Sequence, residues 1–586
     1  MNKNKLKILS LVCVISSILF SLLNISFSCD ISIISFPIIL LFSGVLYYST
    51  YYKLFVCNNL KFISVMRELL QYGPYILLVC FVFRRAGNNG TLYILDFFAV
   101  LFWLVFFIFS LVILHYLNPK KLEKIDLAWK KHNDALLSKS KLNVKSFFME
   151  IVGWIDAIVQ SVFMVLLLNI FIVQLYEIPS ESMVPEFLVK DRVIVFKTAS
   201  GPKFPLSDVG LPYIKNYKRG DIVVFRNPHY SSDRKSEVRT FLSQIVFMCT
   251  LTTVNINVDD SGNPKADPLV KRIVGVPGEQ LMMQDGILYS RTFANDNWNP
   301  VTEENKWACW NLNNVKYSIK KDILDFPVSQ EEYDTMLEVE SLRNSLDLKI
   351  SAQECYNIAN RFDNAFKLLS MKKEIEDIST FFDSKNMLEY SLFSKHSTFV
   401  KNILSAQNGN VWFRKFMTDW ITTIKTDFNG NLYDEANYKL NIMIKKLVGS
   451  IFLRDAELLS QKYDITNIKN DYKLYEYMKE AEKLNSYIYL LDRRNMPIFP
   501  KNKDDGTPQY IPENSYFMMG DNRFNSLDMR HSYDLRIEPL TVYDKYSVFY
   551  YSNMNPQLIK KDKILGETSY RFWPLNRRGV PGHTGM

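Results

Sequence analysis

The sequence lacks the residue patterns on which zinc sites and disulfide frameworks depend. Its 7 cysteines form no CxxC pair, and only 6 histidines occur among the 586 residues. The cysteines stand at positions 13, 29, 57, 80, 249, 309 and 355. Structural zinc sites and disulfide scaffolds require closely spaced or regularly arranged cysteines and histidines. The sequence therefore predicts no bound metal, no disulfide framework and no cofactor.

A strong excess of charge of one sign is also missing. The 70 basic and 61 acidic residues leave a net charge of +9 over the whole chain. Spread over this length, the charge is too dilute for a nucleic-acid-binding surface, so nucleic acid is not an expected partner. The length is roughly four times the commonest domain size, which predicts two or more folding units.

Long apolar runs are present, and they are concentrated in the first third of the chain. Five segments approach the ~20 residues that cross a bilayer as a helix, which predicts about five membrane spans within residues 1–176. The segments are 8–28, 32–50, 69–83, 92–117 and 151–176. The third is the shortest and contains Gly73 and Pro74, two residues that membrane helices tolerate when neighbouring groups satisfy the freed backbone.

The distribution of lysine predicts how these spans are oriented. Lys3, Lys5 and Lys7 precede the first segment, and residues 118–150 hold 8 lysines against 4 acids. Short cytoplasmic loops carry an excess of Lys and Arg, so both regions are expected in the cytoplasm. Five crossings then place residues 177–586 outside the cytoplasm.

Two features qualify this topology. Arg84 and Arg85 would lie in a short outer loop, against the usual charge rule. A cleaved signal peptide is the alternative interpretation of residues 1–28, which have a basic start and an apolar core. No clear small-x-small cleavage motif precedes Asp30, so we expect a retained membrane span.

Four short motifs follow the fifth apolar segment. The first, 178–185 (IPSESMVP), lies at the predicted membrane edge, and the second, 218–228 (KRGDIVVFRNP), is typical of a turn, a strand and a proline stop. The third, 270–279 (VKRIVGVPGE), places a lysine in an apolar strand, and the fourth, 517–530 (FMMGDNRFNSLDMR), is a polar loop. Taken singly, each motif also fits an ordinary loop, strand or salt-bridged turn.

The lysine of the third motif carries the chemical argument. An apolar environment disfavours the charged amine and can lower a lysine pKa to ~7–8, which makes a neutral general base available. Serine is a poor nucleophile until a neighbouring group accepts its proton.

In this order, and beside the membrane, the four motifs resemble those of the type I signal peptidases, membrane serine proteases that remove signal peptides from exported proteins. The resemblance covers residues 176–228, 268–291 and about 509–552. A tail at 570–577 (YRFWPLNR) is similar to the ending of many members of that family.

The resemblance implies a role for four polar residues. Ser182 matches the nucleophile and Lys271 its general base, a Ser/Lys dyad. Ser526 matches the serine that orients the lysine amine through a hydrogen bond. Ser180 matches the hydroxyl that forms the oxyanion hole together with the backbone N–H of Ser182.

The resemblance also implies a structural frame around these groups. Asp528 and Arg530 match a pair that holds the loop carrying the base-orienting serine, and Asp221 and Arg272 are expected to have similar structural roles. The positions that line the substrate pocket are the two apolar residues Ile178 and Val270.

The chain departs from the family pattern at two positions. Met529 stands where many members have a small or hydroxyl residue, and Glu181 stands beside the nucleophile where many have glycine. The Glu181 carboxylate either tunes the local potential or faces water, and we expect it to face water.

The predicted fold class is a multi-span α-helical membrane region followed by a mainly-β, signal-peptidase-like Ser/Lys protease domain with an α-helical insertion. The two parts of the catalytic domain are 177–291 and 509–586, and the insertion is 292–508. A capping box at 329–332 (SQEE) predicts a helix start in the insertion. Further helical stretches are expected near 351–405, 432–462 and 471–492.

Two other segments carry structural expectations. The apolar residues within 239–257 are expected to form either a lipid-touching β-hairpin or an ordinary strand pair. The insertion supplies no recognisable nucleophile or base, so we expect it to be separable from bond cleavage, and a linker replacing about 310–495 should leave a small substrate cleavable.

The resemblance therefore implies a multi-pass enzyme of the bacterial inner membrane with an extracytoplasmic catalytic domain. Its expected partners are signal-peptide-bearing precursor proteins, membrane lipids and the secretion machinery. The alternative is a non-catalytic membrane-anchored binding or scaffold protein that works through the insertion. A Ser/His/Asp hydrolase is a further alternative, but the histidines at 229, 396, 531 and 583 lie in no recognisable hydrolase motif.

Overall fold

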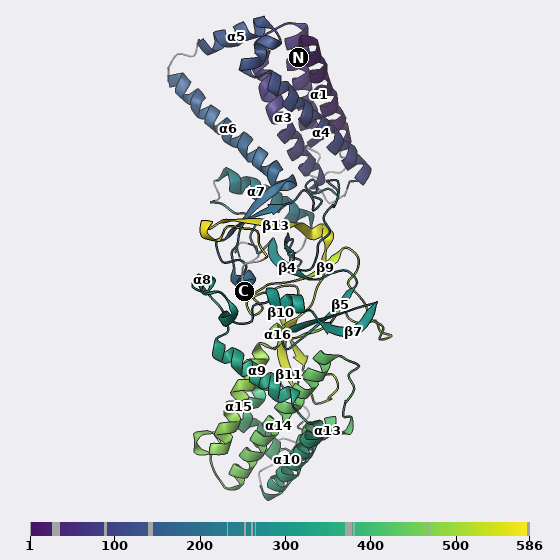
Figure 1. The fold of residues 1–586 in the computed structure, drawn as a ribbon, viewed down its shortest axis with the longest axis vertical. Coiled ribbons are helices and arrows are strands. Elements are labelled where there is room, and N and C mark those ends of the chain that lie inside the picture. Colours follow the sequence, from purple (N-terminus) through teal and green to yellow (C-terminus); the bar gives the residue numbers. More distant parts are fainter. Residues whose placement is uncertain are drawn as a thin grey trace.

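The computed structural model arranges the chain as three regions along one long axis (Figure 1). Membrane-type helices lie at one end, β-sheets in the middle and a second group of helices at the other end. The structure describes residues 2–25, 35–86, 91–138, 144–230, 233–250, 253–259, 262–263, 265–369, 378, 381–466 and 468–582.

Among the residues that the structure describes, five helices are long and apolar enough to cross a membrane, as predicted. They are α1 (Lys3–Leu23), α2 (Ser35–Leu46) continued by a π-helix (Tyr47–Val56), α3 (Phe62–Arg85), α4 (Tyr93–Tyr116) and α6 (Val144–Phe171). A shorter helix, α5 (Leu127–Ser138), lies between the last two. Parts of the first two predicted segments, 26–28 and 32–34, fall outside the described residues.

The predicted bounds of the third and the fifth membrane span are wrong. The third span is not the short segment 69–83, because α3 begins at Phe62 and contains Pro74 within an otherwise continuous helix. The fifth does not reach residue 176, because α6 ends at Phe171 and a strand begins at Val173. The apolar residues after Phe171 belong to the β-sheet. A short apolar run fits a buried strand as well as the end of a membrane helix.

A buried ion pair accounts for Arg85, one of the two arginines that broke the charge rule. The Nη2 atom of Arg85 lies 2.5 Å from Oδ1 of Asp96, and its Nη1 donates to the side chain of Asn24 at 3.0 Å. The other Asp96 oxygen accepts a hydrogen bond of 2.9 Å from the hydroxyl of Ser207, which lies beyond the fifth span. The pair therefore also joins the membrane helices to the β region.

The main sheet has seven strands in the order β1-β2-β13-β3-β4-β9-β12. Their bounds are β1 (Val173–Glu177), β2 (Arg192–Phe196), β13 (Ile564–Trp573), β3 (Ile222–Phe225), β4 (Leu269–Gly275), β9 (Ser515–Met519) and β12 (Ile559–Lys560). Neighbouring strands are antiparallel, and the register places Val223 opposite Lys271 and Arg272 opposite Met519. The strands of the second, third and fourth motifs are thus adjacent.

A second antiparallel sheet has the order β7-β6-β5-β8. Its strands are β5 (Glu279–Gln284), β6 (Ile287–Thr292), β7 (Asn295–Pro300) and β8 (Met496–Phe499). A separate hairpin pairs β10 (His531–Pro539) with β11 (Phe549–Met554). Both ends of the predicted insertion 292–508 therefore contribute a strand to the β region.

The segment predicted as a hairpin or strand pair is instead a helix, α7 (Arg234–Cys249). The side chain of Asp233 caps its N-terminus by accepting from the backbone N–H of Ser236 at 2.8 Å. Phe241 of α7 packs with Leu166 of α6, so the apolar residues face the fifth span. The prediction failed because a short apolar run without clear periodicity fits a strand and a helix equally well.

Helices dominate the remainder of the insertion. They are α8 (Tyr317–Lys320), α9 (Gln330–Asn344), α10 (Leu348–Leu368), α11 (Glu389–Ser394), α12 (His396–Ser405), α13 (Gly409–Thr422), α14 (Leu432–Ser460), α15 (Tyr472–Tyr489) and α16 (Leu491–Arg494). The predicted capping box at Ser329 and Glu332 is confirmed. α14 runs through the centre of a large apolar core. We call the helices α9–α15, which surround this core, the helical subdomain. Residues 370–377 of one predicted stretch lie outside the described residues.

Short 3-10 helices complete the secondary structure. They are Pro119–Lys124, Glu181–Met183, Thr302–Lys306, Leu312–Asn314, Ile468–Asn470, Lys561–Lys563 and Leu575–Arg577.

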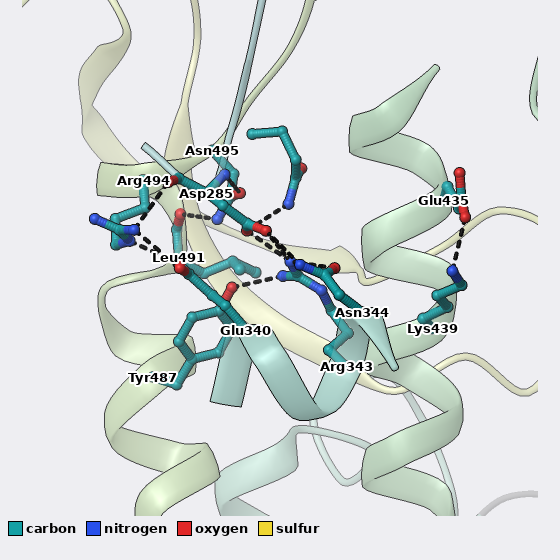
Figure 2. A network of polar contacts seen from close by, with 11 residues as sticks. Asp285, Glu340, Arg343, Asn344, Glu435, Lys439, Tyr487, Leu491, Arg494 and Asn495 are labelled. Carbon is teal, nitrogen blue, oxygen red and sulfur yellow. Dashed lines mark hydrogen bonds and ion pairs between the residues drawn. The ribbon is translucent and has the colours of Figure 1, made fainter. Parts of the chain in front are cut away.

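Buried polar contacts fasten the helical subdomain to the β region (Figure 2). Arg343 of α9 binds both carboxylate oxygens of Asp285, in the turn between β5 and β6, at 2.6 and 2.5 Å. Arg494 of α16 pairs with Glu340 of α9 at 2.6 Å. A second anchor lies at α14, where the fully buried Lys445 contacts the fully buried Asp544. Breaking such pairs on one side leaves a buried charge and is strongly destabilising.

Candidate active site

The serine of the first motif lies in a tight turn between β1 and β2, the first two strands after the membrane helix. β1 follows α6 almost directly, and the 3-10 helix Glu181–Met183 carries Ser182. Met183 and Val184 are buried in two different apolar clusters, whereas Ser182 itself is only partly buried. The apolar neighbours thus fix the turn and leave the hydroxyl accessible.

The lysine of the third motif reaches this serine from the centre of the sheet. Lys271 lies on β4 and is 3% exposed, and its Nζ atom is 2.5 Å from Oγ of Ser182. Burial lowers the pKa of Lys271 from its ordinary value of 10.5 to about 8, although the charges of Asp528 and Asp521 act in the opposite direction. The amine is therefore partly neutral in mildly alkaline solution, where it can accept the proton of the serine hydroxyl.

The two acids near this lysine are each occupied by an arginine. Asp528 and Arg530 are fully buried and form a bidentate pair with distances of 2.9 and 3.0 Å. Burial by itself raises the pKa of Asp528, but the charge and hydrogen bonds of Arg530 outweigh it and hold that pKa well below its usual range. Asp528 also accepts from the backbone N–H of Gly520 at 2.9 Å, which fixes the loop of the fourth motif.

Arg272 does not pair with Asp221. Its Nε and Nη2 atoms bind both oxygens of Asp521 at 2.8 and 2.6 Å, and its Nη1 donates to the carbonyl of Gly220 at 2.9 Å. The Asp221 carboxylate instead accepts from the backbone N–H of Lys218 at 2.9 Å, within the turn before β3. Asp521 was not predicted from the sequence to be the partner of Arg272. Its position directly after Gly520, within the fourth motif, was the available signal.

Ser180 and Ser526 both lie near the nucleophile, with different contacts. The hydroxyl of Ser180 is 3.3 Å from Oγ of Ser182. Ser526 is 2% exposed, and within the described part of the chain its Oγ has no hydrogen-bond partner. The predicted hydrogen bond from Ser526 to Lys271 is therefore not formed in this structure.

A close approach at Gly520 explains how Ser526 fits beside the nucleophile. A Cβ atom on Gly520 would lie 2.2 Å from Oγ of Ser526 and 2.4 Å from the carbonyl oxygen of Ser182. Only glycine leaves room for both groups. The neighbouring Asn522 donates its backbone N–H to the same carbonyl and its side-chain amide to the carbonyl of Glu181, both at 3.2 Å. Neither Gly520 nor Asn522 was predicted to contact the nucleophile turn.

The expectation that Glu181 faces water is wrong. Glu181 is 6% exposed, and its Oε1 accepts a hydrogen bond of 2.9 Å from the backbone N–H of Leu324. Burial raises the pKa of the Glu181 carboxyl. The side chain is covered because the first part of the insertion folds over this turn: Val184 packs with Cys309 and Val315.

The two predicted pocket residues share one apolar cluster with the nucleophile turn. Ile178 is buried and Val270 is partly buried, and both pack with Met183 and Ile222. Met529, the other departure from the family pattern, is fully buried in the neighbouring core cluster, so its side chain has a packing role.

The range 310–495, expected to be replaceable by a linker, is not separate from the site. It contains Leu324, which bonds to Glu181, and Arg493, whose Nη1 donates to the carbonyl of Ser526 at 2.9 Å. Long-range contacts of this kind leave no local sequence signal.

Five candidate membrane spans joined to an antiparallel β domain, with a serine and a buried lysine in contact, define a class of membrane-associated protein with the groups for acyl transfer. The family described as "Signal peptidase, peptidase S26" matches residues 151–324 and 460–573, and the chain belongs to this family. The matched parts include β1–β7 and α15–β13, whereas α9–α13 and most of α14 lie outside them.

Three relatives illustrate the similarity. "Signal peptidase I" of Buchnera aphidicola subsp. Baizongia pistaciae is 30% identical over 145 residues, which are 25% of this chain and 35% of that protein. The protein of the same name from Buchnera aphidicola subsp. Schizaphis graminum is 32% identical over 149 residues, which are 25% and 44% of the two chains. "Signal peptidase I" of Pseudomonas aeruginosa is 42% identical over 66 residues, 11% of this chain and 23% of that protein. The chain thus matches less than half the length of each of these relatives.

Proposed function

We propose that the protein is a membrane-bound serine endopeptidase that removes N-terminal signal peptides from exported precursor proteins. The observation that carries the proposal is the contact of 2.5 Å between Nζ of the buried Lys271 and Oγ of Ser182, with the lysine pKa lowered to about 8. Relatives named "Signal peptidase I" support the choice of substrate.

In the proposed reaction, neutral Lys271 takes the hydroxyl proton while Ser182 Oγ attacks the scissile carbonyl carbon. The resulting oxyanion is stabilised by the backbone N–H of Ser182 and the hydroxyl of Ser180, a contribution of roughly 3–4 kcal/mol per donor. The lysine ammonium then returns the proton to the leaving amine as the peptide bond breaks. Water releases the acyl group from Ser182 by the reverse sequence, with Lys271 again as base. No cofactor is needed for these steps.

The surrounding residues have supporting roles in this proposal. Asp528 with Arg530, and Arg272 with Asp521, neutralise each other, so the amine of Lys271 is not held in its charged form by an unpaired acid. Ser526 orients the amine after its side chain turns toward it. The apolar cluster containing Ile178 and Val270 accepts the small side chains at the −1 and −3 positions of the precursor.

The location follows from the same proposal. The five helices anchor the chain in the bacterial inner membrane, and the β region lies on the extracytoplasmic side, where translocated precursors emerge. Membrane lipids surround the helices, and the secretion machinery is a further partner.

The direct test is to incubate detergent-solubilised protein with a signal-peptide-bearing precursor and to map the cut by mass spectrometry. We expect one cut after small residues at −1 and −3, and no cut by Ser182→Ala, which removes the nucleophile with little change in volume. If wild type binds precursor without cutting it at any pH from 6 to 10, the alternative of a non-catalytic scaffold is favoured. Cutting by a well-folded Ser182→Ala preparation, with contaminating peptidase excluded, contradicts the dyad.

A further inference from the structure

The short helix α16 connects the helical subdomain to three other parts of the molecule. Its consecutive residues Asp492, Arg493 and Arg494 each contact a different element. Asp492 accepts from the hydroxyl of Ser552 and the backbone N–H of Asn553 in and beside β11, at 2.7 and 3.0 Å. Arg494 binds Glu340 of α9 and the backbone carbonyl of Asp285 (Figure 2). α16 therefore has no freedom to shift without breaking buried contacts.

Arg493, which stands between Asp492 and Arg494 in the chain, contacts the loop that carries Ser526. Its Nη1 donates to the backbone carbonyl of Ser526 at 2.9 Å, and its own carbonyl accepts from Nη1 of Arg530 at 2.7 Å. Arg530 in turn holds Asp528, two residues after Ser526. The loop that carries Ser526 is thus fixed from one side by its own ion pair and from the other by α16.

This arrangement restricts what Ser526 can do. Its backbone is held, and its buried Oγ has no partner in the described part of the chain. Rotation about χ1 is the movement that remains for the hydroxyl, and it selects among three staggered positions. A fixed backbone with one free torsion is suited to a group that must reach an amine and release it during a reaction.

We propose that Arg493 is a positioning residue of the active site, which holds Ser526 within reach of Lys271, and that α16 thereby makes the docking of the helical subdomain a condition of catalysis. The inference rests on the proposed function, since it assumes that Lys271 acts as base for Ser182. Arg493 itself touches neither the substrate nor the reacting atoms.

The test is a double-mutant cycle with Arg493→Met, Ser526→Ala and the double variant, all in the full-length detergent-solubilised protein. We expect Arg493→Met to lower kcat about 10- to 100-fold, the size of effect caused by a misplaced group, with a smaller change in KM. If Arg493 acts through the Ser526 hydroxyl, it should lower kcat little further in the Ser526→Ala background. Losses that simply multiply would overturn the proposal.

Arg343→Met is the matched control. It removes an arginine that anchors the helical subdomain through Asp285 but has no contact with Ser526. Its effect on kcat should multiply with that of Ser526→Ala, even if it lowers the unfolding temperature as much as Arg493→Met does. Arg493→Lys, which keeps one donor for the carbonyl, should recover part of the loss. No recovery by a folded Arg493→Lys, or the same non-additivity for Arg343→Met, contradicts a specific role.

A second readout separates this inference from the proposed function. The rate at which a p-nitrophenyl ester acylates Ser182, with release of p-nitrophenolate, reports the reactivity of the serine without any precursor. The cycle should give the same non-additivity in this rate, even where Ser526→Ala cleaves too slowly to measure. If wild type is acylated but cuts no precursor, the proposed function fails, and the acylation cycle still decides the role of Arg493.

Discussion

Two buried lysines of this protein differ in what their amines contact. Lys271 in the sheet is 3% exposed and faces the hydroxyl of Ser182, whereas Lys445 in the helical subdomain is fully buried and contacts the carboxylate of Asp544. Burial lowers the pKa of both amines, and at Lys445 the charge of Asp544 opposes the effect. The amine of one lysine thus contacts a neutral hydroxyl, which fits the proton acceptor proposed for Lys271, and the amine of the other is half of an ion pair.

The acids around Lys271 explain the difference. Asp521 and Asp528 raise its pKa, but each is already paired with an arginine. Within the described ranges, Lys271 has no carboxylate at ion-pair distance, whereas Asp544 is available to Lys445. Occupied neighbouring acids favour the neutral amine that the proposed reaction requires of Lys271, and burial alone does not distinguish the two lysines.

The largest effect should come from Lys271→Arg. A guanidinium stays protonated at every workable pH and cannot accept the serine proton, so we expect a loss in kcat of up to ~10⁶-fold. Precursor cleavage over long incubations measures it. Lys445→Arg is the control and should keep measurable cleavage. Near-normal activity of Lys271→Arg would show that Lys271, like Lys445, has only a structural role.

Lys445→Met should affect stability instead. It leaves the Asp544 carboxylate buried without its cation, a change that costs about 3–5 kcal/mol in free energy of unfolding. Denaturant unfolding followed by tryptophan fluorescence measures the loss. Adding Asp544→Asn should recover most of it. If the double variant is no more stable than Lys445→Met, the ion pair does not anchor the helical subdomain.

The pH profile should report Lys271. Because only the neutral amine accepts a proton, kcat/KM should rise about tenfold per pH unit below the lowered pKa and level off above about 8. Between pH 6 and 8 the rise should be roughly 50-fold, and between pH 6 and the plateau roughly 100-fold. Lys445→Met should leave the midpoint in place wherever the variant is folded. A flat profile with chemistry rate-limiting contradicts a neutral lysine base.

Arg272→Gln should give Lys271 an unneutralised carboxylate nearby, as Lys445 has in Asp544. It frees the carboxylate of Asp521, whose negative charge favours the ammonium form of Lys271, so the midpoint of the pH profile should move up by about one unit. The measurement is kcat/KM against pH in a preparation shown to be folded by its unfolding transition. Arg272→Lys, which keeps the charge, should shift the midpoint less. A downward shift would contradict the role of the arginines.

The site's central groups could be predicted from the sequence, because their chemistry is local. The resemblance of the short motifs to a known family paired Ser182 with Lys271, and the structure brings the two residues into contact. Apolar patterning predicted the five spans and the helical insertion, whereas the resemblance implied the β region between them.

The contacts that hold these groups could not be predicted, because they depend on residues far apart in the chain. Glu181 is buried by Leu324, and Ser526 is held by Arg493, both from the ends of an insertion that the motifs do not include. Helix α7 was missed for a different reason, since its short apolar run favours no single period. The contacts of Glu181 and Ser526 were missed because folding brings distant residues together. Helix α7 was missed because its local sequence pattern is ambiguous.

The ion pair between Arg85 and Asp96 has a mechanical consequence for the whole protein. Several contacts attach the β region to the membrane helices, among them the direct passage from α6 into β1, the hydrogen bond from Ser207 to Asp96 and the packing of Phe204 against the helices. A single connection would let the β region rotate relative to the helices, whereas several separate contacts restrict that rotation. The distance of Ser182 from the ends of the helices is then a fixed dimension of the protein, and in the proposed reaction a precursor must bring its scissile bond to that level.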